Sequence, residues 1–340
     1  MKVAVIKELF PGEHRVALVP AVVSTLVKAN HDVLIESNAG IAAGFSDADY
    51  EQAGGTIVHR DEAFEADCVL TVRTCGAAGE TWGSDRKRMS SKSVIIGMAD
   101  PLGSCQACLE DAQTGATIYA LELVPRITRA QSMDVLSSQA NIAGYEAVLL
   151  GATALKKILP MMTTAAGTIR PAKALILGAG VAGLAAIGTS TSLGAITYAF
   201  DVRPEVAEQV ESMGAEFVFL DFKDEQVSDA STGGYASVSS PEFAAAQLDK
   251  FREIAPEMDI VITTALIPNR EAPELWTADM VASMKPGSVI VDLAAEKGGN
   301  CKLTVIDERV VTDNGVIIIG YTDFPSRMAA QASSLYASNI

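Results

Sequence analysis

The sequence of 340 residues is poor in positive charge, cysteine, histidine and aromatic side chains. Lys and Arg number 26 against 42 Asp and Glu, and a chain with this net charge of −16 repels nucleic-acid phosphates and anionic lipid headgroups. Five cysteines are too few and too scattered for a disulfide framework, which indicates a reducing compartment. The first residues lack the basic flank, apolar segment and cleavage site of a secretory signal, so none is expected.

Charge is absent altogether from one long run, 174–200, which hydropathy alone would score as a membrane span. Glycines interrupt this run repeatedly, with threonine and serine between them. Such a stretch is typical of a buried strand, a tight turn and a small-residue helix rather than of a lipid-facing helix. We therefore expect no direct membrane span in this chain.

Apolar residues make up 49% of the chain, which excludes a disordered protein, and the length predicts two domains. The N-terminal half alternates short apolar runs with amphipathic stretches, a pattern typical of a parallel, doubly wound α/β sheet. Ser46 and Asp49 have the spacing of a capping box at the start of a helix. Strands are expected at 3–6, 33–35, 56–58, 68–72, 94–97 and 118–121.

A helix is expected to connect this domain to the next one. From Met133 to Ala154, small or apolar residues recur every three to four positions, which defines a helix face that another backbone can approach closely. Pro160 ends the pattern. The connecting helix is placed at 133–159, the first domain at 1–137 plus 321–340, and the second domain at 138–320.

The second domain again alternates strands and helices, with a polar stretch at 221–240 rich in Ser, Gly and acidic residues. A stretch this long without a clear period is either a mobile lid or a disordered surface loop. The fold class is therefore α/β, with two doubly wound, Rossmann-like domains and a cleft between them. In this domain, a second parallel sheet is completed by strands 174–178, 195–201, 216–220, 259–264 and 288–293, with helices 181–193, 205–213, 242–254 and 277–284.

Gly178, Gly180 and Gly183 form the G-x-G-x-x-G fingerprint of dinucleotide-binding domains, in its required place between a buried strand and a helix. The first glycine permits the tight turn, the second lets the backbone approach a pyrophosphate, and the third lets helix and strand pack closely. Val181 and Ala182 open the helix, whose N-terminal amides and dipole favour phosphate. A purely structural turn is the alternative.

Asp201 ends the next predicted strand, 18 residues beyond Gly183, where a carboxylate accepts hydrogen bonds from the adenosine ribose. A carboxylate there repels a 2′-phosphate, so NAD(H) is favoured over NADP(H). Arg203 argues the other way, since an arginine nearby can hold that phosphate, but we give the carboxylate more weight. Two later segments, 263–268 and 292–294, also follow strand ends and are either ligand contacts or ordinary loops.

Several motifs resemble the alanine dehydrogenase and transhydrogenase family. Lys7-Glu8 followed by 11–20 is similar to the opening of that family, and 125–139 is similar to the hallmark loop of the NAD(H)-binding component of proton-translocating NAD(P) transhydrogenases. The resemblance covers essentially the whole chain, with further matches at 161–168, 178–183, 233–236, 263–268, 284–287 and 325–327.

The resemblance implies a protein that binds NAD(H) and exchanges hydride directly with NADP(H) held on a separate domain, while a membrane domain couples the exchange to proton translocation. It implies that Arg126, Gln131 and Asp134 lie beside the nicotinamide, with Ser137 near its carboxamide. The implied partners are an NADP(H)-binding domain and a membrane proton channel. A homodimer and a cytoplasmic location at the inner face of the membrane are also expected.

The same resemblance marks further nucleotide contacts. Tyr235 is expected on a mobile loop that closes over the bound nucleotide. The remaining expected positions are Val202, Gly233, Gly234, Gln247, Thr264, Ala265 and Leu266. It also implies that the last helix runs on past Ile340, so a shortened chain, a separate subunit and a partial copy all stay open.

The chemistry fits these roles, because hydride transfer between two nicotinamides needs only approach and orientation of the rings. Arg126 is spaced to pair with Asp134, and Gln131 is expected on the same helix face as Asp134. The amide of Gln131 offers a donor and an acceptor to ribose hydroxyls or a carboxamide. The alternative is a helix-start ion pair beside a solvated glutamine.

Two rival functions stay open. Alanine dehydrogenase chemistry needs a proton donor and cations for the substrate carboxylate. Arg15 meets the second need, but Arg73 stands where relatives have a lysine, and no histidine follows the 94–97 strand. The other rival is a nucleotide-binding module without turnover. No metal is expected, and the pair Cys105 and Cys108 is interpreted as two small residues on a packed helix face.

Overall fold

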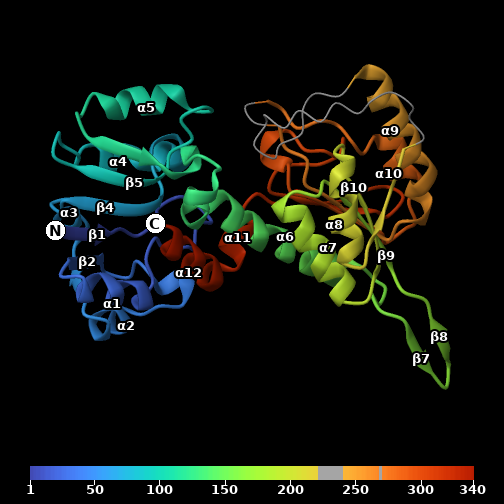
Figure 1. The fold of residues 1–340 in the computed structure, drawn as a ribbon, viewed down its shortest axis with the longest axis horizontal. Coiled ribbons are helices and arrows are strands. Elements are labelled where there is room, and N and C mark those ends of the chain that lie inside the picture. Colours follow the sequence, from blue (N-terminus) through green and yellow to red (C-terminus); the bar gives the residue numbers. More distant parts are fainter. Residues whose placement is uncertain (221–239, 268–269) are drawn as a thin grey trace. The chain divides into compact units, whose positions relative to one another are not determined.

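The computed structural model describes residues 1–220, 240–267 and 270–340. The chain divides into two compact units, Met1–Gln139 with Pro325–Ile340 and Ala140–Phe324, and each contains its own helix-covered sheet (Figure 1). Helix α6 (Val135–Ala154) carries the chain from the first unit into the second.

The first unit is built on a six-stranded, fully parallel sheet with the order β3-β2-β1-β4-β5-β6. Its strands are β1 (Lys2–Val5), β2 (Asp32–Glu36), β3 (Thr56–Val58), β4 (Cys68–Arg73), β5 (Val94–Met98) and β6 (Thr117–Ala120), close to the predicted ranges. The strand order reverses direction between β1 and β4, which makes their carboxyl ends the topological switch point of this sheet.

Helices cover both faces of this sheet. They are α1 (Pro20–Lys28), α2 (Asp47–Gln52), α3 (Arg60–Ala63), α4 (Gly83–Arg86), α5 (Cys105–Ala112), α11 (Phe324–Arg327) and α12 (Ala329–Asn339), with 3-10 turns η1 (Ile41–Ala43), η2 (Cys75–Trp82), η3 (Leu121–Leu123) and η4 (Thr128–Met133). Because side chains alternate along a strand, Val5 packs with side chains of α1, α2 and α12, whereas Ile6 packs with those of α3 and η2. Ser46 and Asp49 form the predicted capping box of α2.

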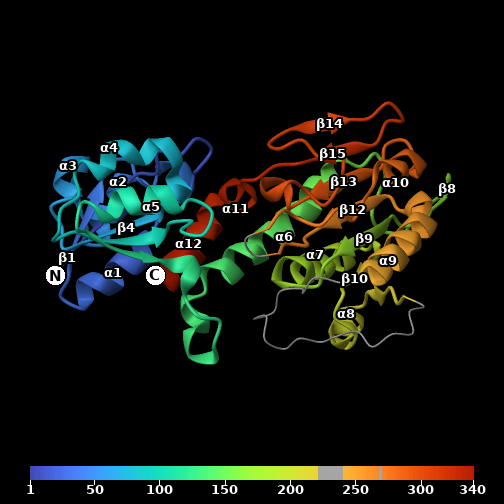
Figure 2. The same cartoon turned by 90° about the horizontal axis from the view of Figure 1, so that it is seen from above.

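The second unit is built on a seven-stranded sheet with the order β11-β10-β9-β12-β13-β15-β14 (Figure 2). Its strands are β9 (Lys173–Leu177), β10 (Ile196–Phe200), β11 (Glu216–Phe217), β12 (Ile260–Thr263), β13 (Val289–Asp292), β14 (Arg309–Val311) and β15 (Ile317–Ile319). The switch point of this sheet lies between β9 and β12.

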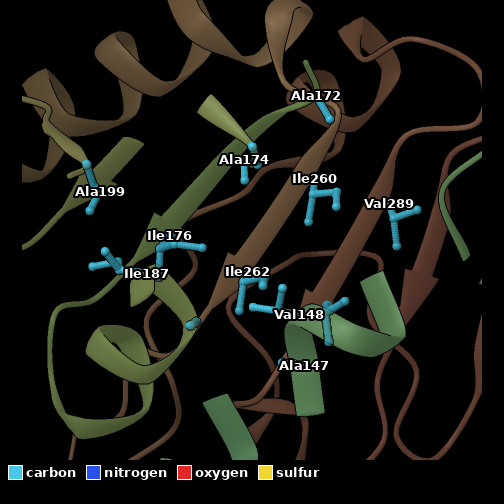
Figure 3. Close-up of a cluster of buried hydrophobic side chains, with 14 of the residues drawn as sticks. Ala147, Val148, Ala172, Ala174, Ile176, Ile187, Ala199, Ile260, Ile262 and Val289 are labelled. Atoms are coloured by element: carbon cyan, nitrogen blue, oxygen red, sulfur yellow. The ribbon is translucent and has the colours of Figure 1, made fainter. Parts of the chain in front are cut away.

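Two buried clusters sandwich this second sheet. The helices are α6, α7 (Val181–Ser192), α8 (Ala207–Ser212), α9 (Pro241–Ile254) and α10 (Ala278–Ser283), with 3-10 turns η5 (Pro204–Val206), η7 (Ala255–Glu257) and η8 (Ala295–Lys297). Ile176 of β9 lies in one cluster with Val148 of α6 and Ile187 of α7 (Figure 3). Leu175, one residue earlier, lies in the other cluster with Phe251 of α9.

The uncharged run 174–200 forms β9, α7 and β10, as predicted, and lies largely inside this sandwich. Among the residues that the structure describes, no helix has both the length and the apolar character needed to cross a membrane.

The connecting helix is shorter than predicted. It begins at Val135 and ends at Ala154, rather than spanning 133–159. The residues after it turn toward the sheet of the second unit, where the buried Leu159 accepts a hydrogen bond from the backbone N–H of Ala172 at 2.9 Å. Tertiary contacts therefore end the helix before Pro160 does.

Two further features depart from the predicted second domain. Strands β7 (Met162–Thr164) and β8 (Gly167–Ile169), to which the sequence pattern assigned no structure, form an antiparallel hairpin that extends beyond the other elements of its unit (Figure 1). The sheet does not end at β13, because β15 pairs with it in parallel and β14 then pairs with β15 antiparallel. The prediction of a purely parallel second sheet is therefore wrong at this edge.

Candidate functional site

The glycine fingerprint forms the turn between β9 and α7, at the switch point of the second sheet. Gly178 has φ 104°, a left-handed conformation that favours glycine. A Cβ on Gly183 would lie 1.8 Å from the carbonyl oxygen of Gly178, so the turn and the helix pack as closely as predicted. A Cβ on Gly180, in contrast, would meet no described atom within 4 Å. The backbone at Gly180 therefore borders open room.

This open room fits the phosphate end of a dinucleotide. The first intrahelical bond of α7 runs from the N–H of Leu184 to the carbonyl of Gly180, at 2.8 Å. The amides of Val181 and Ala182 precede that bond, so the helix gives them no acceptor and they favour an anion. A side chain at position 180 would fill the cradle, and glycine leaves it empty.

Helix α6 supports the same turn from behind. A Cβ on Gly144 of α6 would lie 2.0 Å from the carbonyl oxygen of Ala182, in the first turn of α7. Only a residue without a side chain lets the two helices approach so closely. The prediction that the small-residue face of α6 admits another backbone is confirmed at this position.

Asp201 follows β10 and holds both the glycine turn and Arg203. Its Oδ2 accepts a hydrogen bond from the N–H of Ala179 at 2.7 Å, and its Oδ1 accepts from the backbone N–H and the Nε of Arg203, each at 2.9 Å. The hydrogen bond to Asp201 is the main cause that raises the pKa of Arg203, against the effect of burial. Val202 between them is half-buried. The arginine that would attract a 2′-phosphate is thus already paired with an acid.

The loop after β12 lies against the glycine turn and is held by an asparagine. Thr264 donates from its backbone N–H to the carbonyl of Leu177 at 2.8 Å. Asn300 accepts from the N–H of Ala265 at 3.1 Å and donates to the carbonyl of Ala265 at 2.9 Å. Leu266 is exposed. The sequence pattern gave no sign of Asn300, because it lies 35 residues from its partner.

The other expected nucleotide contacts lie farther along the chain. Gln247 is buried on α9. Gly233, Gly234 and Tyr235, with the rest of the proposed lid, lie outside the described residues.

The hallmark loop of the first unit ends at the start of α6. Asp134 directly precedes the helix and accepts hydrogen bonds from the N–H of Ser137 at 2.9 Å and from its Oγ at 2.7 Å, as an N-cap residue does. Arg126 Nη2 donates to Ser137 Oγ at 3.2 Å, and Arg126 Nε lies 3.6 Å from Asp134 Oδ2. The structure therefore brings Arg126, Asp134 and Ser137 together, with the predicted ion pair.

Gln131 does not share a helix face with Asp134, so that expectation is wrong. It lies in the 3-10 turn η4, and regular helix begins only at Val135. Its carbonyl accepts a hydrogen bond from the N–H of Asp134 at 3.3 Å, and its side chain is exposed. Three of the four residues thus form a compact cluster, while the fourth presents its amide to the surroundings.

A separate charged cluster is buried at the carboxyl end of β4. Glu13 Oε2 lies 2.6 Å from Arg15 Nη2 and 2.8 Å from Arg73 Nε. Burial alone would raise the pKa of Glu13, but the charges and hydrogen bonds of Arg15 and Arg73 outweigh it and lower the pKa to about 2. Both cations that were candidates for a substrate carboxylate are therefore neutralised by one acid of the chain.

Glu8 lies beside this cluster. Burial, and next the charge of Glu13, raise the pKa of Glu8 to about 7. The shift persists although Glu8 accepts hydrogen bonds from Thr71 Oγ1 at 2.7 Å and from the N–H of Val72 at 2.6 Å.

Metal chemistry finds no support in the side chains. Within residues 1–220, 240–267 and 270–340, no group of three or more His, Cys, Asp or Glu side chains is arranged to hold a metal ion. Cys105 is exposed and Cys108 is half-buried, so only Cys108 fits the expected packed face.

Comparison with known proteins gives matches over the full chain. Family models for the N-terminal and C-terminal domains of alanine dehydrogenase/PNT match residues 4–143 and 147–340. The chain is 57% identical over 342 residues to an NAD(P) transhydrogenase subunit alpha of Cereibacter sphaeroides, and it spans only 64% of the length of that relative. It is 45% identical over 345 residues to an NAD(P) transhydrogenase subunit alpha chain of Rhodospirillum rubrum, of which it covers 88%. All of this chain is covered in both cases.

Solved structures agree. A transhydrogenase from Sinorhizobium meliloti matches with a TM-score of 0.89 and 43% identity, covering 100% of this chain and 91% of the other. An L-alanine dehydrogenase matches with a TM-score of 0.81 and 27% identity, covering 99% and 86%. The predicted class of two Rossmann-like α/β domains is confirmed.

Proposed function

Because the chain belongs to the alanine dehydrogenase/PNT family of NAD-binding oxidoreductases, we propose that it is the NAD(H)-binding component of a proton-translocating NAD(P) transhydrogenase. In this function hydride passes directly between NAD(H) on this chain and NADP(H) on a partner domain. The observation that carries the proposal is the glycine turn with open room at Gly180, in a chain whose relatives are named as transhydrogenase alpha subunits.

The second unit supplies the grip on the coenzyme. The free amides at the start of α7 receive the pyrophosphate, and Asp201 accepts hydrogen bonds from the adenosine ribose. Asp201 also sets the preference for NAD(H), because its charge repels a 2′-phosphate and keeps Arg203 paired. Thr264, Ala265 and Leu266 line the neighbouring strand end.

The first unit supplies orientation at the nicotinamide end. Bound NAD(H) provides or accepts the hydride, and the protein places the ring against that of NADP(H). Asp134 and Ser137 hold Arg126 at the helix start, which fixes the direction of the guanidinium. Gln131 offers its exposed amide to ribose hydroxyls or a carboxamide. No proton donor is required for this transfer.

Alanine dehydrogenation is the nearest rival, supported by the likeness to an L-alanine dehydrogenase structure. Its chemistry needs cations for the substrate carboxylate and a general acid. In this chain Glu13 already pairs with Arg15 and Arg73, and residues 98–100 after β5 are Met, Ala and Asp. An absorbance assay for alanine-dependent reduction of NAD separates the two functions, and we expect no reaction.

The partners follow from the function. We infer an NADP(H)-binding domain and a membrane proton channel, which keep the protein at the cytoplasmic face of a membrane. We also infer a homodimer, because the hairpin of β7 and β8 exposes Met161 and Met162 and a two-stranded hairpin is marginal in water without a surface to pack on. Sedimentation measures the oligomeric state directly.

Coenzyme binding tests the proposal at its base. NADH should bind with the micromolar affinity typical of such sites, on the order of −8 kcal/mol, and NADPH far more weakly. Equal affinity for both would refute the role given to Asp201. A chain that binds NADH yet exchanges no hydride with any NADP(H) component would instead be a nucleotide-binding module without turnover.

A further inference from the structure

Asn339, at the end of α12, is tied to the loop that carries Gln131. We infer that Asn339 is a positioning residue for hydride transfer, acting by fixing the backbone beside Gln131. This inference rests on the proposed function, because it assigns a purpose to the same loop.

The contacts of Asn339 join three segments that are distant in the sequence. Its Nδ2 donates to the carbonyl of Ser132 in η4 at 2.7 Å, across 207 residues. Its Oδ1 accepts from Ser138 Oγ in α6 at 2.6 Å. One side chain therefore bridges η4 and the first turns of α6 from the surface of α12.

These two bonds fix the orientation of the amide. A backbone carbonyl only accepts, so the –NH₂ group of Asn339 must face Ser132. The carbonyl group of the amide then faces Ser138, whose hydroxyl donates. An aspartate at position 339 would lose the donor and place a negative charge against the Ser132 carbonyl.

Asn339 acts from a well-anchored base. Tyr336, one turn earlier on α12, is fully buried and donates from its hydroxyl to the carbonyl of Thr71 at 2.9 Å. Gln139 of α6 donates to the carbonyl of Ala332 at 3.1 Å and accepts from Arg15 at 2.9 Å. Helix α12 is thus fastened to both the sheet and α6.

The loop needs such a restraint at one place. On the N-terminal side of Gln131, Ala130 is buried and anchors the chain by packing. On the C-terminal side, Ser132 and Met133 are exposed, so packing holds them weakly. The hydrogen bond from Asn339 to the Ser132 carbonyl supplies the second anchor, and Gln131 is held between the two.

A transfer that depends on ring orientation is sensitive to this anchor. Displacement of a positioning group by about 1 Å can slow such a reaction about 100-fold. Because Ala130 still anchors one side, we expect Asn339→Ala to slow hydride transfer roughly tenfold. The affinity for NADH should change less than about twofold, since the pyrophosphate seat lies in the other unit.

The experiment compares Asn339→Ala with a matched control on the same helix turn. Ser338 is exposed and bonds only to the Ser334 carbonyl of its own helix, so Ser338→Ala should transfer hydride at the wild-type rate. Single-turnover transfer, NADH affinity and hydrogen exchange of the 128–134 amides are measured for each protein. The expected result is slow transfer with unchanged affinity and faster exchange in Asn339→Ala alone.

Ser138→Ala keeps the inference testable if Asn339→Ala folds poorly. It removes only the bond that orients the Asn339 amide, and the double variant should be no slower than Asn339→Ala. Wild-type transfer rates in both variants, or additive losses in the double variant, would overturn the inference and leave the proposed function standing. A wild-type protein that transfers no hydride overturns the proposed function and this inference together. Altered hydrogen exchange in Asn339→Ala then records a structural tie alone.

Discussion

Two glycine-to-alanine substitutions separate coenzyme binding from folding within a single turn. Gly180 has φ −76° and ψ −169°, which any residue adopts, and its added Cβ would meet no described atom within 4 Å. Gly180→Ala should therefore leave the free energy of unfolding unchanged or raise it by about 0.4–1 kcal/mol. The new methyl group fills the cradle, so the affinity for NADH should fall at least tenfold, about 1.4 kcal/mol.

Gly183→Ala should show the opposite pattern. Its Cβ would lie 1.8 Å from the backbone carbonyl oxygen of Gly178, an overlap that no side-chain rotation relieves. Overpacking of this kind costs about 1–3 kcal/mol, which outweighs the roughly 1 kcal/mol better helix propensity of alanine. The protein should unfold at a lower temperature even without coenzyme.

Thermal unfolding followed by circular dichroism, with and without NADH, measures both effects on the same samples. Wild-type coenzyme affinity in Gly180→Ala would mean that the pyrophosphate does not lie at this turn. Wild-type stability in Gly183→Ala would contradict the close packing of turn and helix. Either result would refute the reasoning for that position.

Three further outcomes are expected. Gln131→Asn should keep NADH affinity nearly intact while slowing hydride transfer to an NADP(H) component, and equal loss of both would mean that the glutamine only supports binding. Because the pKa of Glu8 is raised from 4.5 to about 7, its contribution to stability is complete below pH 4.5 and is lost as the pH rises through 7. Urea unfolding of Glu8→Gln should therefore vary less between pH 5 and pH 8 than that of the wild type, and equal pH dependence would contradict this. Burial, and then the hydrogen bond to Asp111, raise the pKa of Cys75, whereas Cys105 is exposed, so Cys105→Ser should abolish the fast phase of thiol labelling.

Local patterns predicted the elements that position the coenzyme. The strand, turn and helix around Gly178 follow from hydrophobic runs and glycine spacing, which act over a few residues. The capping box at Ser46 is equally local. The ion pair of Arg126 and Asp134 was also predicted, because the two side chains are close enough in the sequence for a short loop to let them meet.

Features that depend on distant partners could not be predicted in this way. The end of α6 at Ala154 depends on the bond between Leu159 and Ala172, not on helix propensity. Strands β14 and β15 are short, and each is stable only against a neighbour in the sheet. Asn300 and Asn339 act through partners 35 and 207 residues away, and an isolated asparagine carries no pattern that announces such a contact.

The central claim is that hydride passes directly between two nucleotides, one on this chain and one on a partner. The most direct measurement mixes the protein with a separate NADP(H)-binding component, supplies NADH carrying deuterium at the transferable C4 position, and follows the label by mass spectrometry. Direct transfer predicts deuterated NADPH without exchange of the label with water. Label found in the solvent, or NADPH without deuterium, would contradict the account.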